Sequence, residues 1–327
     1  MRRIWVLLLG LMAFGAGAPG AAAQLTPERI LPAVVGVEAE TVADARSAAT
    51  LGTTRQASGV VIDGAGLVLT IGFAVMEAER VSVLAEGGKR LPARVIAYHS
   101  ESGLGLLRVP TGLDASPLRL GDSTKLATRD PVLIVAYGGA DSAQPALVVS
   151  KRPFAGSWEY LLDSAIYTSP PHPLWTGAAL IDGDGRLVGI GYLQVADAVP
   201  DTVLPGNMFV PVDLLKPILA DLLAEGRESG PRRPWLGLYT DETKGRLIVE
   251  RVAADGPAAA AGLKPGDIVL GVAGQPVRSL EAFYRALWSS GSAGTEVELT
   301  VLKDLTPETV RVRSADRYGW LRKPQSF

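Results

Sequence analysis

Cysteine is absent from this sequence of 327 residues, and histidine occurs only twice. Without cysteine the chain cannot form disulfide bonds or thiolate metal sites, and a bacterial lipoprotein, which carries its lipid on a cysteine, is excluded. Two histidines and no cysteine also argue against a catalytic zinc ion. We therefore expect no metal and no cofactor.

An excess of basic charge is missing as well. Acidic and basic residues are interspersed along the chain and nearly balance, at a formal net charge of -2. Contacts to a phosphate backbone require a basic stripe, and the sequence contains none. Nucleic acid is therefore not expected as a partner.

The N-terminus has the three-part layout of a secretory signal. Two arginines precede the uncharged run 4–14, and a small-residue stretch ends at Ala23. This layout predicts a signal peptide over 1–23 and export across the inner membrane to the periplasm. The alternative is an uncleaved membrane anchor, although the glycine, alanine and proline residues from Gly15 onward weaken a span that needs about 20 apolar residues.

Residues 24–225 have the pattern of a β-rich domain. Short β-branched or leucine-rich runs such as 59–62, 132–135 and 187–190 are separated by turn sequences such as Asp63-Gly64. Closely spaced strands of this kind predict a mostly antiparallel barrel or sandwich. The apolar spacing over 212–225 then predicts a closing helix.

Residues 226–233 contain glycine, proline and arginine without an apolar run, which predicts a solvated linker crossed by few contacts. A small α+β domain is expected over 234–315, followed by a tail over 316–327. Its predicted elements are strands at 246–252, 268–272, 296–302 and 309–313, a short helix near 257–261, and a helix over 279–288 with Ser279 as N-cap.

Residues 234–315 resemble a PDZ domain as found in the HtrA protease family. The resemblance rests on Trp235-Leu236-Gly237-Leu238, on the segment 261–269 and on the helix that begins at Ser279. It implies that the N–H groups of the Leu-Gly-Leu stretch form a nest for a C-terminal carboxylate, with the peptide added as a strand beside 238–240. The implied peptide-binding residues are Trp235, Leu236, Gly237, Leu238, Tyr239, Leu280, Phe283 and Tyr284.

Two further features bear on this groove. The apolar helix residues also fit the alternative that they fill the domain core. Asp241 and Glu242 follow the short strand 238–240 and are expected to repel peptides that are acidic upstream of their terminus. Peptide preference therefore stays open.

The first domain resembles the trypsin-like domain of the same family. The matching segments occur in the family's order and include 59–62, 106–109, 120–123 and 189–190. The resemblance implies a mainly β fold, a trypsin-like double β-barrel followed by a small α+β PDZ domain, with the active site in the cleft between the barrels.

The resemblance also assigns the catalytic positions, and this sequence departs from the family at each. Phe73 stands at the position of the histidine, Gly103 at that of the aspartate and Thr176 at that of the serine. Phenylalanine accepts no proton, glycine has no side chain, and a threonine hydroxyl needs an adjacent base. Leu174 also replaces the glycine that shapes the family's oxyanion hole.

Few residues could take over the lost roles. His172 precedes Thr176 by four residues and is a weak stand-in as general base, because the neighbouring prolines restrict it and no carboxylate is apparent nearby. His99 is interpreted as a loop histidine, and Glu101 as a surface carboxylate on a turn.

The sequence thus predicts an exported HtrA-like pseudoprotease that binds C-termini or unfolded segments of envelope proteins as an adaptor, regulator or holdase. One alternative is an atypical hydrolase that uses Thr176 with His172. Another is a non-catalytic subunit in mixed oligomers with active relatives, since the family's habit implies homo-trimers or mixed trimers.

Overall fold

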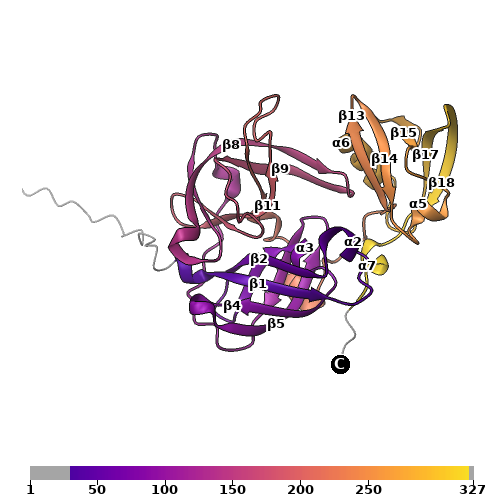
Figure 1. The fold of residues 1–327 in the computed structure, drawn as a ribbon. Helices are drawn as coiled ribbons and strands as arrows, with labels where there is room; N and C mark the ends of the chain where they lie inside the picture. The colour runs from indigo at the N-terminus through magenta and orange to yellow at the C-terminus, as the bar shows by residue number, and fades with distance from the viewer. Residues whose placement is uncertain (1–29, 324–327) are drawn as a thin grey trace, which may run out of the picture.

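The computed structural model describes residues 30–323, so the predicted signal peptide and the last residues of the tail lie outside the described range. Two closed β-barrels lie side by side, and a smaller sheet domain lies beyond the second barrel (Figure 1). Within 30–323 no helix combines the length and the apolar character needed to cross a membrane.

The first barrel has six antiparallel strands in the closed order β1-β2-β3-β6-β5-β4. Its core contains fully buried branched residues such as Val35, Leu69 and Leu106. The predicted turn at Asp63-Gly64 is confirmed, because the Asp63 carboxylate accepts the N–H of Leu67 at 2.7 Å and closes the β2–β3 hairpin. The strands are β1 (Val34–Thr41), β2 (Thr54–Val61), β3 (Leu67–Ile71), β4 (Ala78–Leu84), β5 (Arg90–His99) and β6 (Leu104–Arg108).

The second barrel repeats this architecture in the order β10-β11-β12-β9-β8-β7, which confirms the double-barrel fold that the resemblance implies. β8 and β9 pair as far as Gly156 and Tyr160, and their hairpin projects toward α6 of the sheet domain (Figure 1). The strands are β7 (Pro131–Val135), β8 (Ala143–Gly156), β9 (Tyr160–Ser169), β10 (Ala179–Ile181), β11 (Leu187–Val195) and β12 (Gly206–Pro211).

The single closing helix predicted over 212–225 is wrong in its extent. A 3-10 turn at Val212–Leu214 is separated from helix α4 (Leu219–Glu225) by turn residues around Pro217. Proline has no N–H to donate and disfavours helical geometry at the preceding residue. The other short helical segments of the barrels are η1 (Leu31–Ala33), α2 (Ala48–Leu51), α3 (Gly72–Val75), η2 (Glu86–Gly88), η3 (Ser123–Lys125) and η4 (Gly139–Ser142).

The C-terminal domain is a small sheet with two helices, and its predicted elements are confirmed. The Ser279 hydroxyl accepts the N–H of Ala282 at 3.1 Å and caps α6 as expected. Asp241 and Glu242, however, lie within β13 rather than after it, and the Glu242 carboxylate accepts the N–H of Leu280 at 2.9 Å. The elements are β13 (Leu238–Thr243), β14 (Arg246–Val252), α5 (Pro257–Ala260), β15 (Ile268–Val272), β16 (Gln275–Pro276), α6 (Leu280–Ser289), β17 (Glu296–Lys303) and β18 (Thr306–Arg313).

The segment 226–233 is not the contact-poor linker that its composition predicts. The Glu228 carboxylate accepts a hydrogen bond from His99 Nε2 at 3.0 Å, and Arg233 forms an ion pair with Glu101 at 2.8 Å. The segment therefore lies against the first barrel, because its charged side chains find partners on the β5–β6 turn.

The residues after 315 also pack back onto the molecule. They form helix α7 (Arg317–Trp320), whose Tyr318 hydroxyl accepts the N–H of Ser100 at 2.8 Å, while the Trp320 ring lies 5.0 Å from that of Trp235. Arg322 then donates its N–H to the Glu77 carboxylate at 2.7 Å. This segment thus joins the C-terminal domain to the first barrel.

Candidate functional site

Of the three positions assigned to catalysis, Phe73 and Gly103 line the cleft between the barrels, and Thr176 directly follows Trp175, which also lines it. Phe73 lies in α3, directly after β3, and the Arg55 guanidinium holds this turn by donating to the Phe73 carbonyl at 2.7 Å. The Phe73 ring contacts the rings of Tyr192 and Trp175, with centroids 5.8 and 6.4 Å away. An aromatic cluster therefore surrounds the position that the resemblance assigns to the catalytic histidine.

Gly103 lies beside this turn, since the Gly72 N–H donates to the Gly103 carbonyl at 2.7 Å. Its φ of 75° is in the left-handed region that favours glycine. A Cβ at this position would lie 2.8 Å from the hydroxyl oxygen of Tyr160, which donates to the Ser102 carbonyl at 2.7 Å. Tyr160 therefore fills the space that a side chain at position 103 would need.

Thr176 is half-buried on the opposite wall, where its carbonyl accepts the Ser58 N–H at 2.8 Å. The N–H of Leu174, at the glycine position of the family's oxyanion hole, donates to His172 Nδ1 at 3.0 Å. A donor already bonded inside the protein is not free to stabilise an oxyanion. The cleft therefore lacks one of the donors that acyl transfer would require.

The stand-in histidine is engaged elsewhere. His172 is buried, and its backbone N–H donates to the Asn207 amide oxygen at 2.6 Å. Its side chain bonds to the backbone of Ser142. Burial lowers the pKa of its imidazole despite the Ser142 bond. Within residues 30–323, no hydrogen bond connects either histidine to Thr176.

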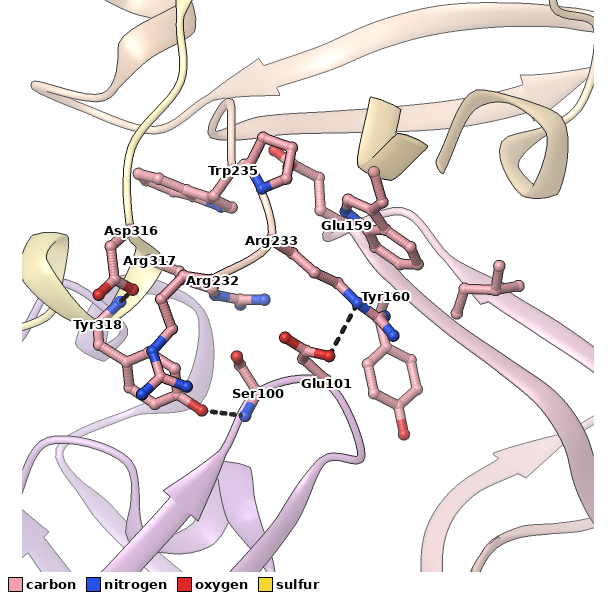
Figure 2. A pocket seen from close by; sticks show the side chains of 13 residues that line it. Ser100, Glu101, Glu159, Tyr160, Arg232, Arg233, Trp235, Asp316, Arg317 and Tyr318 are labelled. Atoms are coloured by element: carbon pink, nitrogen blue, oxygen red, sulfur yellow. Dashed lines mark hydrogen bonds and ion pairs between the residues drawn. The ribbon is translucent and has the colours of Figure 1, made fainter. Parts of the chain in front are cut away.

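His99 also belongs to a group of three potential metal ligands, with Glu101 and Glu228. Each has a protein partner: His99 contacts Ser102 and Glu228 through its two ring nitrogens, and Glu101 pairs with Arg233 (Figure 2). Burial lowers the pKa of His99 below its ordinary value. These three residues therefore form part of the contact between the first barrel and residues 226–233.

The cleft itself opens into a cavity of about 380 Å³. Its walls include aromatic rings from both barrels and from the C-terminal segments. Such a surface can hold an apolar group, but it offers no base to accept a proton from a hydroxyl. The aromatic lining residues are Phe73, Tyr98, Trp158, Trp175, Tyr192, Tyr239 and Trp320.

The predicted carboxylate nest, formed by the N–H groups of Leu236, Gly237 and Leu238, faces a carboxyl group of the same chain. Glu159, at the end of the β8–β9 hairpin, accepts the N–H of Gly237 at 2.6 Å and that of Leu238 at 2.8 Å through Oε1. The Leu236 N–H lies 3.0 Å from Oε2 and 3.2 Å from Oε1. Figure 2 shows Glu159 directed toward the chain at Trp235. This is the arrangement expected for a bound terminal carboxylate.

The rest of the hairpin tip, residues 156–161, occupies the groove beside the nest. The Ser157 carbonyl accepts the N–H of Thr240, which lies in the edge strand β13, at 3.0 Å. The Tyr284 hydroxyl donates to the Gly156 carbonyl at 2.6 Å. Leu161 is 7% exposed and joins the hydrophobic core of the C-terminal domain, together with Leu238.

The other predicted groove residues divide between two surroundings. Leu280, Phe283 and Tyr284 are buried in that same core, and the Tyr284 hydroxyl also bonds to the backbone of the hairpin. Trp235 pairs with Ala315 through its backbone, and Tyr239 lies under the Arg251 guanidinium at the aromatic cavity.

Glu159 was not found by sequence reasoning. It lies 77 residues before Leu236 in the chain, in a turn without a recognisable motif. Its φ of 55° is uncommon for a residue with a side chain. Burial raises the pKa of Glu159 to about 7, against the opposing effect of the nest N–H groups and of Arg317.

Known protein families match both halves of the chain in the observed order. Residues 57–190 match the trypsin-like peptidase domain, and residues 234–313 match the PDZ domain. The fold and the two matches therefore define a class of protein in which a trypsin-like domain is followed by a PDZ domain. Curated relatives include a Serine protease Do-like HtrA from Lactobacillus helveticus, which is 24% identical over 282 residues and covers 77% of this chain and 66% of the relative.

Two curated relatives illustrate the similarity. A probable periplasmic serine endoprotease DegP-like from Pseudomonas fulva is 26% identical over 280 residues, covering 78% of this chain and 54% of the relative. The serine protease PepD of Mycobacterium tuberculosis is 27% identical over 306 residues, covering 86% and 63%. The chain thus spans between half and two thirds of the length of these relatives.

Solved structures agree in fold. A serine endoprotease from Yersinia pestis matches with a TM-score of 0.53 and 21% identity, covering 91% of this chain and 99% of that one. An HtrA-type protease, AlgW with tripeptide, matches with a TM-score of 0.51 and 21% identity, covering 91% and 96%. At this identity the similarity concerns the fold.

Proposed function

We propose that this chain is an exported, non-proteolytic member of the HtrA group whose PDZ domain binds the C-termini or extended segments of envelope proteins, as an adaptor, regulator or holdase. The observation that carries the proposal is the nest: three consecutive backbone N–H groups converge on one carboxyl group. A terminal carboxylate offers the same acceptor atoms. The periplasmic names of relatives support an exported location.

The contacts in the cleft support the absence of proteolysis. A serine-type mechanism needs a base beside the nucleophile and free oxyanion donors. Phe73 offers no base, Tyr160 fills the space at Gly103, and the Leu174 N–H is bonded to His172. The loss of such groups typically lowers the rate by about 10⁴ to 10⁶.

The proteolytic part is tested with purified full chain and unfolded casein. We expect no cleavage above that in buffer, with an active HtrA protease as positive control. Thr309→Ala, an exposed threonine of the PDZ domain, is the matched control for Thr176→Ala. Cleavage that Thr176→Ala abolishes and Thr309→Ala preserves would establish the alternative hydrolase and contradict the proposal.

The binding part is tested with a library of C-terminal peptides, each presented with a free carboxylate and as the amide. We expect the amide to weaken binding by roughly tenfold or more, because it replaces an anionic oxygen in the nest. Equal binding of both forms would show that the nest does not recognise the terminus.

A further inference from the structure

We propose that the hairpin tip is an internal ligand of the PDZ groove, so that a partner's C-terminus binds only when residues 156–161 leave it. This inference rests on the proposed function, because it names what regulates the peptide site. It starts from the observation that the nest, the strand edge and the apolar wall of the groove are all engaged by one segment of the same chain.

The polar contacts reproduce both halves of peptide recognition. The Glu159 carboxyl group satisfies the three nest N–H groups, as a chain terminus would. The Ser157 carbonyl accepts the Thr240 N–H at the open edge of the sheet, where an added peptide strand would form its backbone bonds. A second peptide cannot use these donors while the hairpin holds them.

The apolar contacts point the same way. Leu161 inserts into the cluster that contains Leu236 and Leu280, and Ala155 packs against that cluster. On the outer side, Arg285 of α6 forms an ion pair with Asp163 of β9 at 2.5 Å. The hairpin therefore presents a carboxyl group, a strand edge and an apolar side chain in the combination that the groove binds.

The backbone at Glu159 indicates that its side chain offsets a local conformational cost. Its left-handed φ of 55° would suit glycine or asparagine better. The residue found there instead is one whose carboxyl group reaches the nest. Backbone strain that persists in this way is a feature of clamps and switch segments.

The test compares the full chain with Glu159→Ala, and uses Glu86→Ala as matched control because Glu86 is exposed on the turn between β4 and β5. The probe is the set of free-carboxylate peptides used above. If the groove is free in a tenth of the molecules or fewer, Glu159→Ala should tighten peptide binding by roughly tenfold or more. Glu86→Ala should bind as the unchanged chain does.

A second measurement reports on the hairpin without any peptide. Hydrogen exchange at the amides of Leu236, Gly237, Leu238 and Thr240 should be slow in the unchanged chain and in Glu86→Ala, and faster by roughly tenfold or more in Glu159→Ala. Unchanged exchange at these amides in a folded Glu159→Ala protein would overturn the inference. Glu159→Gly, which lacks the carboxyl group and suits the left-handed φ of 55°, replaces Glu159→Ala if the latter does not fold.

The two failures are distinguishable. Equal peptide affinity in the unchanged chain and in Glu159→Ala would reject the internal ligand while leaving the proposed function intact. If no free-carboxylate peptide binds either protein although exchange is faster in Glu159→Ala, the proposed function fails, and with it the idea of competition for the groove.

Discussion

At the scale of single residues, the proposed absence of proteolysis is supported by neighbouring residues that fill the space at the positions assigned to the triad by resemblance. Tyr160 occupies the space above Gly103, and His172 holds the Leu174 N–H. Restoring one catalytic side chain would therefore meet both a steric and a hydrogen-bonding obstacle. The proposed absence of proteolysis therefore rests on packing as well as on residue identity.

The packing at Gly103 can be measured directly. Gly103→Ala should lower the free energy of unfolding by about 1–3 kcal/mol, because a Cβ at φ 75° would contact the Tyr160 hydroxyl at 2.8 Å. Urea denaturation checks this value. Gly64→Ala, where a Cβ meets nothing within 4 Å, is the control and should change stability by less than about 0.5 kcal/mol.

A double-mutant cycle separates the cost of the contact with the Tyr160 hydroxyl from the cost of the backbone conformation at position 103. In a Tyr160→Phe background the nearest atom would be a ring carbon at 3.3 Å, so Gly103→Ala should cost less than it does beside the hydroxyl. An identical cost in both backgrounds would mean that the backbone conformation alone resists the substitution.

Restoring residues should also leave the protein inactive. The triple variant with Phe73→His, Gly103→Asp and Thr176→Ser is expected to hydrolyse casein no faster than the unchanged chain, because the aspartate cannot reach its place past Tyr160. Measurable hydrolysis by a folded triple variant would contradict the steric argument.

At the scale of elements, the β8–β9 hairpin contains a titrating contact. Burial raises the pKa of Glu159 to about 7 from an ordinary value of 4.5. A carboxyl group whose pKa is raised by folding stabilises the folded state. This stabilisation is complete below the unfolded pKa and is lost as the pH rises through the folded pKa. Docking of the hairpin should therefore weaken between about pH 4.5 and 7.

The measurement is the difference in unfolding free energy between the unchanged chain and Glu159→Gln at pH 5 and pH 8. It should fall by up to about 3 kcal/mol, since each pKa unit corresponds to about 1.4 kcal/mol. Tyr284 and Arg317 face Glu159, and burial raises the pKa of Tyr284. The other charged residues that line this cavity are Glu101, Arg232, Arg233 and Asp316. A difference that stays constant or grows with pH would contradict this sign.

Several elements could be predicted from sequence because local signals determine them. The strands 246–252 and 268–272 agree with β14 and β15, and the N-cap at Ser279 is formed as expected. The helix over 212–225 failed where Pro217 outweighed an apolar period. The nest donors follow from the resemblance, but Glu159 could not be predicted, because its contact joins residues far apart in the chain.

At the scale of the whole molecule, the two domains are connected by more than the hairpin. Residues 226–233 and α7 both contact the β5–β6 turn, through Arg233 with Glu101 and Tyr318 with Ser100 (Figure 2). Composition alone cannot predict this, since the same charged residues would suit a solvated linker. Residues 226–233 pack against the first barrel because their charged side chains have partners there.

Removal of residues 316–327 should therefore expose the linker. Without α7, Tyr318 no longer binds Ser100 and Trp320 no longer covers Trp235, so trypsin should cleave after Arg232 roughly tenfold faster or more; the bond after Arg233 precedes Pro234 and resists trypsin. Mass spectrometry of timed digests measures the rate. A chain lacking only 324–327 is the control and should be cleaved at the original rate; equal rates in both truncations would mean that α7 does not hold the linker.

The hairpin places two neighbouring side chains in two different cavities. Trp158 forms part of the aromatic wall of the cleft, where its indole N–H donates to the Tyr192 hydroxyl at 3.1 Å, while Glu159 reaches the nest. Because adjacent residues move together, a peptide that expels one must disturb the other. A small molecule that binds between the barrels only while Trp158 is in place would then lower the affinity for chain termini, and the termini would lower its affinity by the same factor.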